Sequence, residues 1–224
     1  MKKAVVVAPH ADDELISCGG TILNLVEEGW EVSWILCTKI LGNKNQFNIK
    51  KDTRNKQIED IYKKLGLQSL HELNYPAGEV CSSHLPALVN DISNLFKSSE
   101  PNLIFLPFPG DAHTDHKYVF QAGKAACKWF RYPHVEKVLC YETLSETNFD
   151  YNPDTLAFRP NIYIDIENQI DKKIALSKVY FNEFGAHPFP RSEDAITALA
   201  KYRGSSAGFK YAEAFQLILS RGNF

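Results

Sequence analysis

Short hydrophobic runs alternate with longer amphipathic segments over the first part of the chain. The runs that predict buried strands cover residues 3–8, 32–37, 69–73, 103–108 and 135–141. The segments with apolar residues at helical spacing follow the first run as far as Glu28 and then cover residues 53–65, 85–97 and 116–131. Strands that alternate with helices of this length predict an α/β fold, in which a mostly parallel sheet carries helices on both faces.

The pattern becomes less regular after Glu146. The elements expected there are an edge strand at 161–166, helices at 169–184 and 195–202, a loop at 186–192 and an apolar element of undetermined type at 211–219. The chain has no internal repeat and no clear linker. We therefore predict a single domain over residues 1–224, made of an α/β core (about 1–146) and a C-terminal extension (about 147–224).

Two polar clusters follow the first and fourth predicted strands. The first is His10-Ala11-Asp12-Asp13-Glu14, and the second is His113-Thr114-Asp115-His116. In a doubly wound sheet with the usual order 3-2-1-4-5, these two strands are neighbours where the strand order reverses, and ligands bind there. We therefore expect the clusters to face each other across one crevice. The first loop lacks G-x-G-x-x-G, which argues against dinucleotide binding.

Gly19 and Gly20 interrupt the helical pattern that follows the first cluster. A glycine inside a helix costs about 1 kcal/mol relative to alanine. We therefore expect the helix to begin only at this pair, after a long loop. Glu14 is either a hydrogen-bond partner behind the site or a charge that favours the helix start.

Three residues of the clusters form a plausible metal-ligand set. A catalytic zinc site usually has three nitrogen or oxygen ligands and one open position, and His10, Asp13 and His116 supply such a set. Zinc is the default ion, and ferrous iron or another divalent metal also fits.

The remaining residues of the clusters suit proton transfer. Asp12 is the expected general base, because neighbouring residues of an extended loop point in different directions. His113, when protonated, is the expected donor to the oxyanion. We expect Asp115 to orient His113 and to raise its pKa.

Candidate substrate-binding residues lie outside the two clusters. Arg54 follows the long loop 39–51 and either binds substrate hydroxyls or is a solvated charge. His187 and Arg191 flank the proline-bent loop, where a structural role is the alternative. We predict that all three residues bind the substrate.

Composition narrows the function classes. Hydrophobic residues make up 44% and charged residues 23% of the 224 residues, as in an ordinary globular domain. The net charge of −2 gives no electrostatic footprint for nucleic acid or an anionic membrane. No apolar run approaches the roughly 18 residues of a membrane span, and the run after Lys3 is too short for a signal peptide. The five cysteines lack C-x-x-C spacing, so we expect small buried side chains in a cytoplasmic protein.

The motifs resemble those of a known family. The run Ala8–Glu14 followed by Gly19-Gly20-Thr21 resembles the first signature of the PIG-L/LmbE-like N-acetylglucosaminyl deacetylases, and His113–His116 resembles their H-x-D-H signature. A weaker similarity covers His187-Pro188, Arg191-Ser192, Arg203-Gly204 and Tyr211–Phe215. The resemblance implies a Rossmann-like fold and metal at His10, Asp13 and His116. It also implies a base at Asp12 and oxyanion help from His113 with Asp115 behind it.

Two positions and one short segment depart from the family pattern. Ala11 stands where the family commonly has proline, and Thr38–Gly42 replaces a glycine-bearing turn. Gln57 stands where a glutamate is often found. These changes leave the metal ligands intact and concern the substrate contacts.

The resemblance predicts metal-dependent hydrolysis of the N-acetyl group of an amino sugar or its conjugate, giving acetate and a free amine. One alternative is a metal-dependent amidase acting on a thiol or other conjugate. Another is a non-catalytic sugar-binding relative, which the complete set of polar residues argues against. The expected partner is a small amino-sugar molecule, without nucleic acid or a membrane span. The sequence leaves open whether the chain forms a homo-oligomer.

Overall fold

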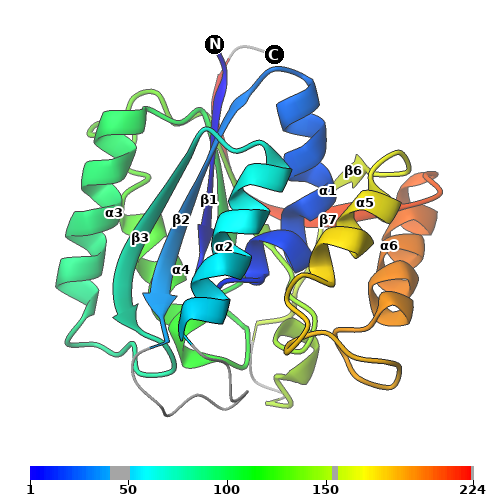
Figure 1. The fold of residues 1–224 in the computed structure, drawn as a ribbon. Helices are drawn as coiled ribbons and strands as arrows, with labels where there is room; N and C mark the ends of the chain where they lie inside the picture. The colour runs from blue at the N-terminus through cyan, green and yellow to red at the C-terminus, as the bar shows by residue number, and fades with distance from the viewer. Residues whose placement is uncertain (41–50, 153–155, 223–224) are drawn as a thin grey trace.

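A seven-stranded sheet runs through the computed structural model, which describes residues 1–40, 51–152 and 156–222 (Figure 1). The strand order is β3-β2-β1-β4-β5-β7-β6. The first five strands are parallel and follow the predicted order 3-2-1-4-5, whereas β7 pairs antiparallel with β5 and β6. The strands are β1 (Lys3–Ala8), β2 (Glu31–Lys39), β3 (Ser69–Pro76), β4 (Leu103–Pro107), β5 (Lys137–Tyr141), β6 (Ile162–Asp165) and β7 (Ala212–Ser220). The predicted α/β fold is confirmed.

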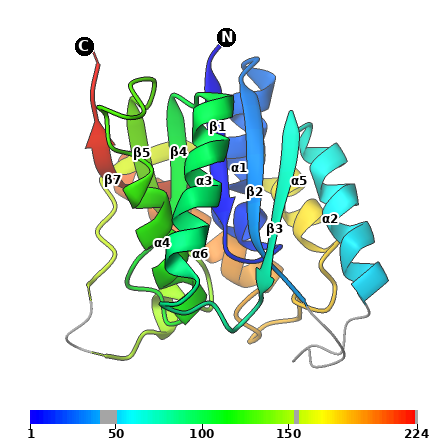
Figure 2. The same cartoon turned by 90° about the vertical axis from the view of Figure 1, so that its left-hand side faces the viewer.

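Helices cover both faces of this sheet. The helices are α1 (Asp13–Glu27), α2 (Lys51–Leu65), α3 (Leu85–Ser99), α4 (Thr114–Ala125), α5 (Ile170–Ser177) and α6 (Glu193–Ala207). Helices α1 and α2 lie on one face, and α3 and α4 lie on the other (Figure 2). Side chains of β1 alternate between two cores: Ala4, Val6 and Ala8 pack on the side of α1 and α2, whereas Val5 and Val7 pack on the side of α3 and α4. Because both faces are covered, β1 is apolar at every position from Ala4 to Ala8.

The C-terminal extension continues the sheet. The apolar run of undetermined type, 211–219, forms strand β7 (Ala212–Ser220), which joins β6 to the parallel core. Between these strands, α5 and α6 pack around Ile166, Ile170 and Ile196. The division of the domain near residue 146 stays a prediction.

The glycine pair lies inside helix α1, so the expectation that the helix begins at Gly19 is wrong. The helix begins at Asp13, and the pair is needed for close packing. A Cβ on Gly20 would lie 2.6 Å from Ile166 Cγ2. Close approach also lets the Glu213 carboxylate accept hydrogen bonds from the backbone N–H groups of Gly20 (2.8 Å) and Thr21 (2.7 Å).

Several predicted helix boundaries are also wrong. Helix α4 ends at Ala125 rather than Arg131, because short-range turn bonds follow, such as Cys127 N–H to the Lys124 carbonyl. Helix α5 ends at Ser177, where bonds between residues three apart replace the α-helical ones.

Two other helices begin earlier than predicted. Helix α6 begins at Glu193, because Ser192 Oγ caps it by accepting the N–H of Ala195 (3.1 Å). Helix α2 already includes Lys51, so Asp52 lies in its first turn. Residues 41–50, which include Leu41, Gly42 and most of the predicted long loop, lie outside the described residues.

The cysteines are all free. Cys18, Cys37 and Cys140 are buried as expected, and Cys127 is half-buried, but Cys81 is exposed on the loop before α3. Within the described ranges, no helix has both the length and the apolar character that a membrane crossing requires.

We predict that Gly20→Ala lowers the free energy of unfolding by about 1–3 kcal/mol, because the new methyl group collides with Ile166. The loss should appear although alanine favours helices by about 1 kcal/mol over glycine. Urea denaturation measures the change. Asn90→Ala, on the exposed face of α3, is the matched control and should not destabilise the protein. A Gly20→Ala variant as stable as the wild type would show that the packing explanation is wrong.

Candidate metal centre

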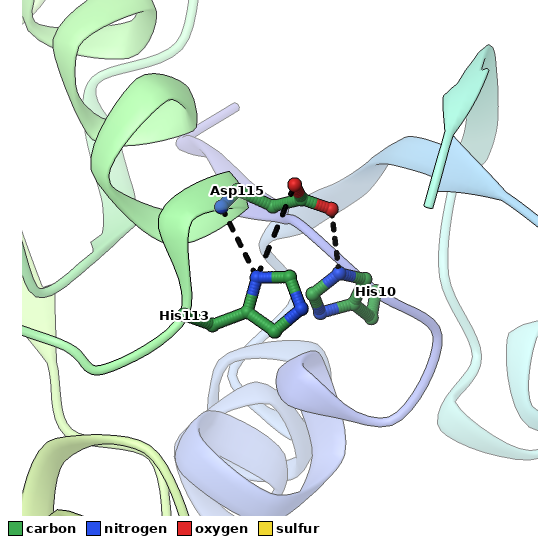
Figure 3. Close-up of side chains that lie close together, drawn as sticks. All are labelled: His10, His113 and Asp115. Carbon is green, nitrogen blue, oxygen red and sulfur yellow. Dashed lines mark hydrogen bonds and ion pairs between the residues drawn. The ribbon is translucent and has the colours of Figure 1, made fainter. Parts of the chain in front are cut away.

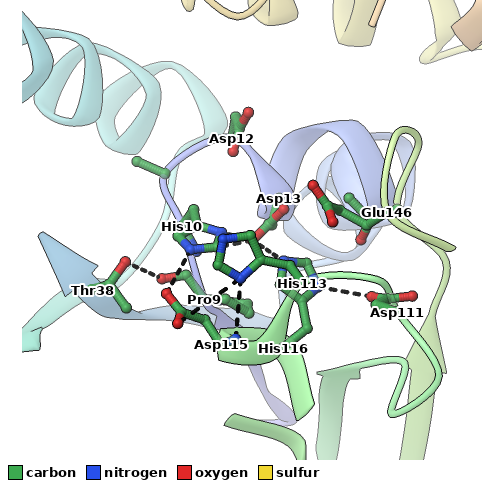
Figure 4. A network of polar contacts seen from close by, with 12 residues as sticks. Pro9, His10, Asp12, Asp13, Thr38, Asp111, His113, Asp115, His116 and Glu146 are labelled. Atoms are coloured by element: carbon green, nitrogen blue, oxygen red, sulfur yellow. Dashed lines mark hydrogen bonds and ion pairs between the residues drawn. The ribbon is translucent and has the colours of Figure 1, made fainter. Parts of the chain in front are cut away.

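Two adjacent parallel strands bring the polar clusters together. β1 pairs with β4 in register Val6 to Phe105, so both strands end at the same edge of the sheet. His10 and Asp13 follow β1, whereas His113 and His116 lie at the start of α4, which follows β4 (Figure 4). The expectation that the two clusters face each other is confirmed.

Three side chains converge on one point. Asp13 Oδ2 lies 3.5 Å from His10 Nδ1 and 3.3 Å from His116 Nε2. One potential ligand atom from each of the three residues lies within 4.8 Å of those of the others. Asp13 Oδ1 and His116 Nε2 are buried and make no hydrogen bond within the described residues, although buried polar atoms are nearly always paired. The donor set therefore fits a divalent ion.

The second nitrogen of each imidazole is held by a carboxylate. His10 Nε2 lies 2.9 Å from Asp115 Oδ2 (Figure 3), and His116 Nδ1 lies 2.8 Å from Asp111 Oδ2. A carboxylate only accepts hydrogen bonds, so the nitrogen facing it donates. In the neutral ring, the opposite nitrogen then offers its lone pair toward Asp13, an arrangement common among metal-binding histidines.

The same neighbours determine the charge of the metal-free cluster. Burial lowers the pKa of His10, but hydrogen bonds to Asp115 and Asp13 outweigh burial and raise it to about 9. Burial would raise the pKa of Asp13, but the charges of His116 and His10 hold it well below its usual value. Asp13 therefore stays ionised, as a metal ligand must.

Asp111 belongs to the site and was missed by the sequence reasoning. Its Oδ1 accepts a hydrogen bond from Thr147 Oγ1 (2.6 Å), while its Oδ2 holds His116. Asp111 follows Pro109-Gly110, where an aspartate reads as an ordinary turn residue. The available signal was its place just beyond a central strand, next to the second cluster.

Asp115 is predicted to orient His113, and the two side chains form a long ion pair, with Asp115 Oδ1 3.9 Å from His113 Nδ1. The Asp115 carboxylate is used by His10 and by the backbone N–H groups of Gly78 (2.8 Å) and Val80 (3.1 Å). His113 Nδ1 instead accepts the backbone N–H of Asp115 at 3.1 Å (Figure 3). Burial and the charge of His10 lower the pKa of His113 to about 4, and the opposing effect of Asp115 is smaller. The neutral ring therefore carries its proton on Nε2.

Asp12 occupies a sharp turn between His10 and helix α1. Its φ of 141° is unusual for a residue other than glycine, and its side chain points away from Asp13 (Figure 4). The backbone N–H of Asp12 donates to Glu14 Oε2 (3.0 Å), and Glu14 Oε1 accepts the Tyr180 hydroxyl (3.0 Å). Glu14 therefore holds this turn, which answers the question of its role. Burial raises the pKa of Asp12 to about 8.

The three substrate candidates lie in different surroundings. Arg54 is buried rather than solvated, and its Nη1 donates to the Ala11 carbonyl at 3.0 Å. Arg191 contacts Asp12 through Nη1. His187 is exposed, and within the described residues no hydrogen bond or ion pair joins it to this cluster. Substrate binding by these residues stays a prediction.

A parallel-sheet fold with two histidines and a buried aspartate at neighbouring strand ends is typical of a metal-dependent hydrolase. The PIG-L family, described as GlcNAc-PI de-N-acetylase, matches residues 5–127, which is more than half of the chain. The chain therefore belongs to the PIG-L family, and the predicted resemblance is confirmed.

Similar proteins extend this likeness along the whole chain. A diacetylchitobiose deacetylase from Thermococcus kodakarensis is 21% identical over 97% of this chain and 84% of its own length. The conserved protein TT1542 from Thermus thermophilus has a TM-score of 0.80 and 24% identity, covering 100% of this chain and 98% of its own. GalB, the 4-carboxy-2-hydroxymuconate hydratase from Pseudomonas putida, has a TM-score of 0.75 and 19% identity, covering 100% and 99%. The two structural likenesses establish the fold.

We predict that Asp111→Ala weakens metal binding about 10–100-fold, because His116 loses the carboxylate that orients its ring. Competition with a chelator of known affinity measures the change. Asp91→Ala removes a carboxylate that binds Tyr75 instead, and serves as the control. Equal metal affinity in wild type and Asp111→Ala would contradict the role of Asp111.

Proposed function

We propose that this protein is a metal-dependent N-deacetylase that hydrolyses the acetamido group of an amino sugar or an amino-sugar conjugate. The observation that carries the proposal is the convergence of His10, Asp13 and His116 beside the buried carboxylate of Asp12. Family membership and the names of the deacetylase relatives support the same reaction class.

The ion would be held by His10, Asp13 and His116. Two imidazoles and one carboxylate suit zinc, and they also suit ferrous iron. When bound, the ion would supply Lewis-acid chemistry at the amide carbonyl and lower the pKa of water from about 15.7 to about 7.

Asp12 is the proposed general base. Its Oδ2 contacts Arg191, which leaves Oδ1 to accept a proton. The carboxylate takes a proton from the attacking water and returns it to the departing amine nitrogen. Burial raises the pKa of Asp12 toward neutrality, and a group that titrates near the working pH can carry out both transfers.

His113 is the proposed hydrogen-bond donor to the oxyanion. Its ring lies 4.5 Å from that of His10 between centroids, which places it beside the metal cluster. Because Nδ1 accepts the N–H of Asp115, Nε2 of the neutral ring carries a hydrogen that it can donate. Donation therefore does not require the protonated imidazolium that the sequence suggested.

A small pocket of about 40 Å³, with room for water-sized molecules, lies next to the first cluster. The pocket is lined by Ala11, Thr38, Lys39, Arg54 and Glu183, among others. Since the same fold is found in a protein named as a hydratase, the reaction needs a direct assay.

The experiment measures acetate and free amine from protein loaded with zinc or ferrous iron under anaerobic conditions. The panel contains N-acetylglucosamine, N,N'-diacetylchitobiose, an N-acetylglucosaminide and an acetylated thiol conjugate. We expect acetate from at least one amino sugar, loss of activity with a chelator, and recovery when metal is restored. Sugar binding without product would indicate a non-catalytic relative, and activity confined to the thiol conjugate would favour the amidase alternative.

We predict that Asp12→Ala lowers turnover about 10²–10⁴-fold, the usual contribution of a general base, while metal content is unchanged. Acetate release and elemental analysis of the same preparation provide the two readouts. Asp60→Ala, an exposed carboxylate on α2, is the control. Full turnover in Asp12→Ala would refute the base assignment.

A further inference from the structure

One arginine of the C-terminal extension holds the carboxylate of the proposed base. We propose that Arg191, itself held by Glu183, is a positioning residue for Asp12 rather than a ligand of the substrate. The inference rests on the proposed function of Asp12 as general base.

Each nitrogen of the Arg191 guanidinium faces a protein acceptor. Nη1 contacts Asp12 Oδ2 and lies 2.9 Å from Glu183 Oε2. Nε donates to Ser145 Oγ at 2.8 Å, and Nη2 lies 3.5 Å from Glu146 Oε1. Four of the five N–H groups of the guanidinium therefore face oxygens of the protein, which leaves at most one for a substrate.

Glu183 joins this arginine to a second one. Its Oε2 faces Arg191, and its Oε1 accepts from Arg54 Nη2. Arg54 in turn donates to the carbonyl of Ala11 at 3.0 Å. One carboxylate of the extension therefore holds both the backbone just before Asp12 and the Asp12 side chain.

The ion pairs that join Asp12, Arg191 and Glu183 are buried, so the loss of one charged partner is costly. The side chains of Asp12, Arg54, Glu183 and Arg191 are only 1%, 6%, 10% and 12% exposed. A buried carboxylate that loses its cation pays a large desolvation penalty, so it moves or takes up a proton. Arg191 therefore determines where the Asp12 carboxylate stays.

Within the described residues, no group other than Arg191 forms a hydrogen bond to the Asp12 side chain. As the residue preceding α1, Asp12 makes no side-chain capping bond. Its backbone N–H is held by Glu14, but that contact fixes the turn and not the carboxylate. The carboxylate direction depends on Arg191.

The test compares Arg191→Ala, Arg191→Lys and Glu183→Gln with the wild type. We expect Arg191→Ala to lower kcat about 10²-fold, the cost of misplacing a catalytic group by about 1 Å, with KM and metal content unchanged. Arg191→Lys keeps the charge and should recover part of kcat, and added guanidinium ion should partly rescue Arg191→Ala. Glu183→Gln should give a smaller loss of kcat.

The matched control is Arg203→Ala, followed by Arg203→Lys. Arg203 belongs to the same extension and forms a two-bond pair with Glu142 (2.7 and 2.6 Å) without contacting Asp12. Thermal melts of all variants separate lost stability from lost positioning. Only the Arg191 variants should respond to guanidinium.

Crystal structures of wild type and Arg191→Ala provide a readout that does not depend on activity. We expect the Asp12 carboxylate to be displaced in the variant. A raised KM with unchanged kcat, or an Asp12 carboxylate in its wild-type place, would overturn the inference. If wild-type protein releases no acetate from any substrate, the proposed function fails, and the position of Asp12 in the two structures still decides whether Arg191 holds it.

Discussion

The buried carboxylate of Asp13 is the constraint around which the site is built. It lies between His10 Nδ1 and His116 Nε2, at 3.5 and 3.3 Å, with its Oδ1 unpaired within the described residues. A buried charge needs opposite charge close by. That requirement is met only because β1 and β4 are neighbours and end at the same edge, which brings His10 and His116 to one carboxylate.

The C-terminal extension packs against the parallel core and contacts residues next to the site. Glu213 of β7 binds the backbone of α1 at Gly20 and pairs with Lys173 of α5 at 2.6 Å, so the extension packs closely against the helix that carries Asp13. The same extension supplies Glu183 to Arg54. Gln57, where the family often has glutamate, donates to the Val179 carbonyl instead (2.7 Å). The carboxylate that faces Arg54 therefore comes from the extension and not from α2 itself.

Much of the core could be predicted because its signals are local in the sequence. Continuous apolar runs such as Ala4–Ala8 identify strands that are covered on both faces, and the strand order then places the two clusters together. The remaining features depend on contacts between distant segments. Asp111 looks like a turn residue until His116 is placed beside it, and Gly20 looks like a helix start until Ile166 packs against it.

The carboxylate of Asp115 gives the two neighbouring histidines different roles. Asp115 hydrogen-bonds to His10 through its side chain and to His113 through its backbone N–H, while its Oδ1 lies 3.9 Å from His113 Nδ1. A carboxylate facing His10 favours added positive charge there, either a proton or a metal ion. His113 has no such hydrogen-bonded carboxylate, so burial keeps its ring neutral. Asp115 thus favours His10 as a metal ligand and leaves His113 neutral, with an Nε2–H that can donate a hydrogen bond.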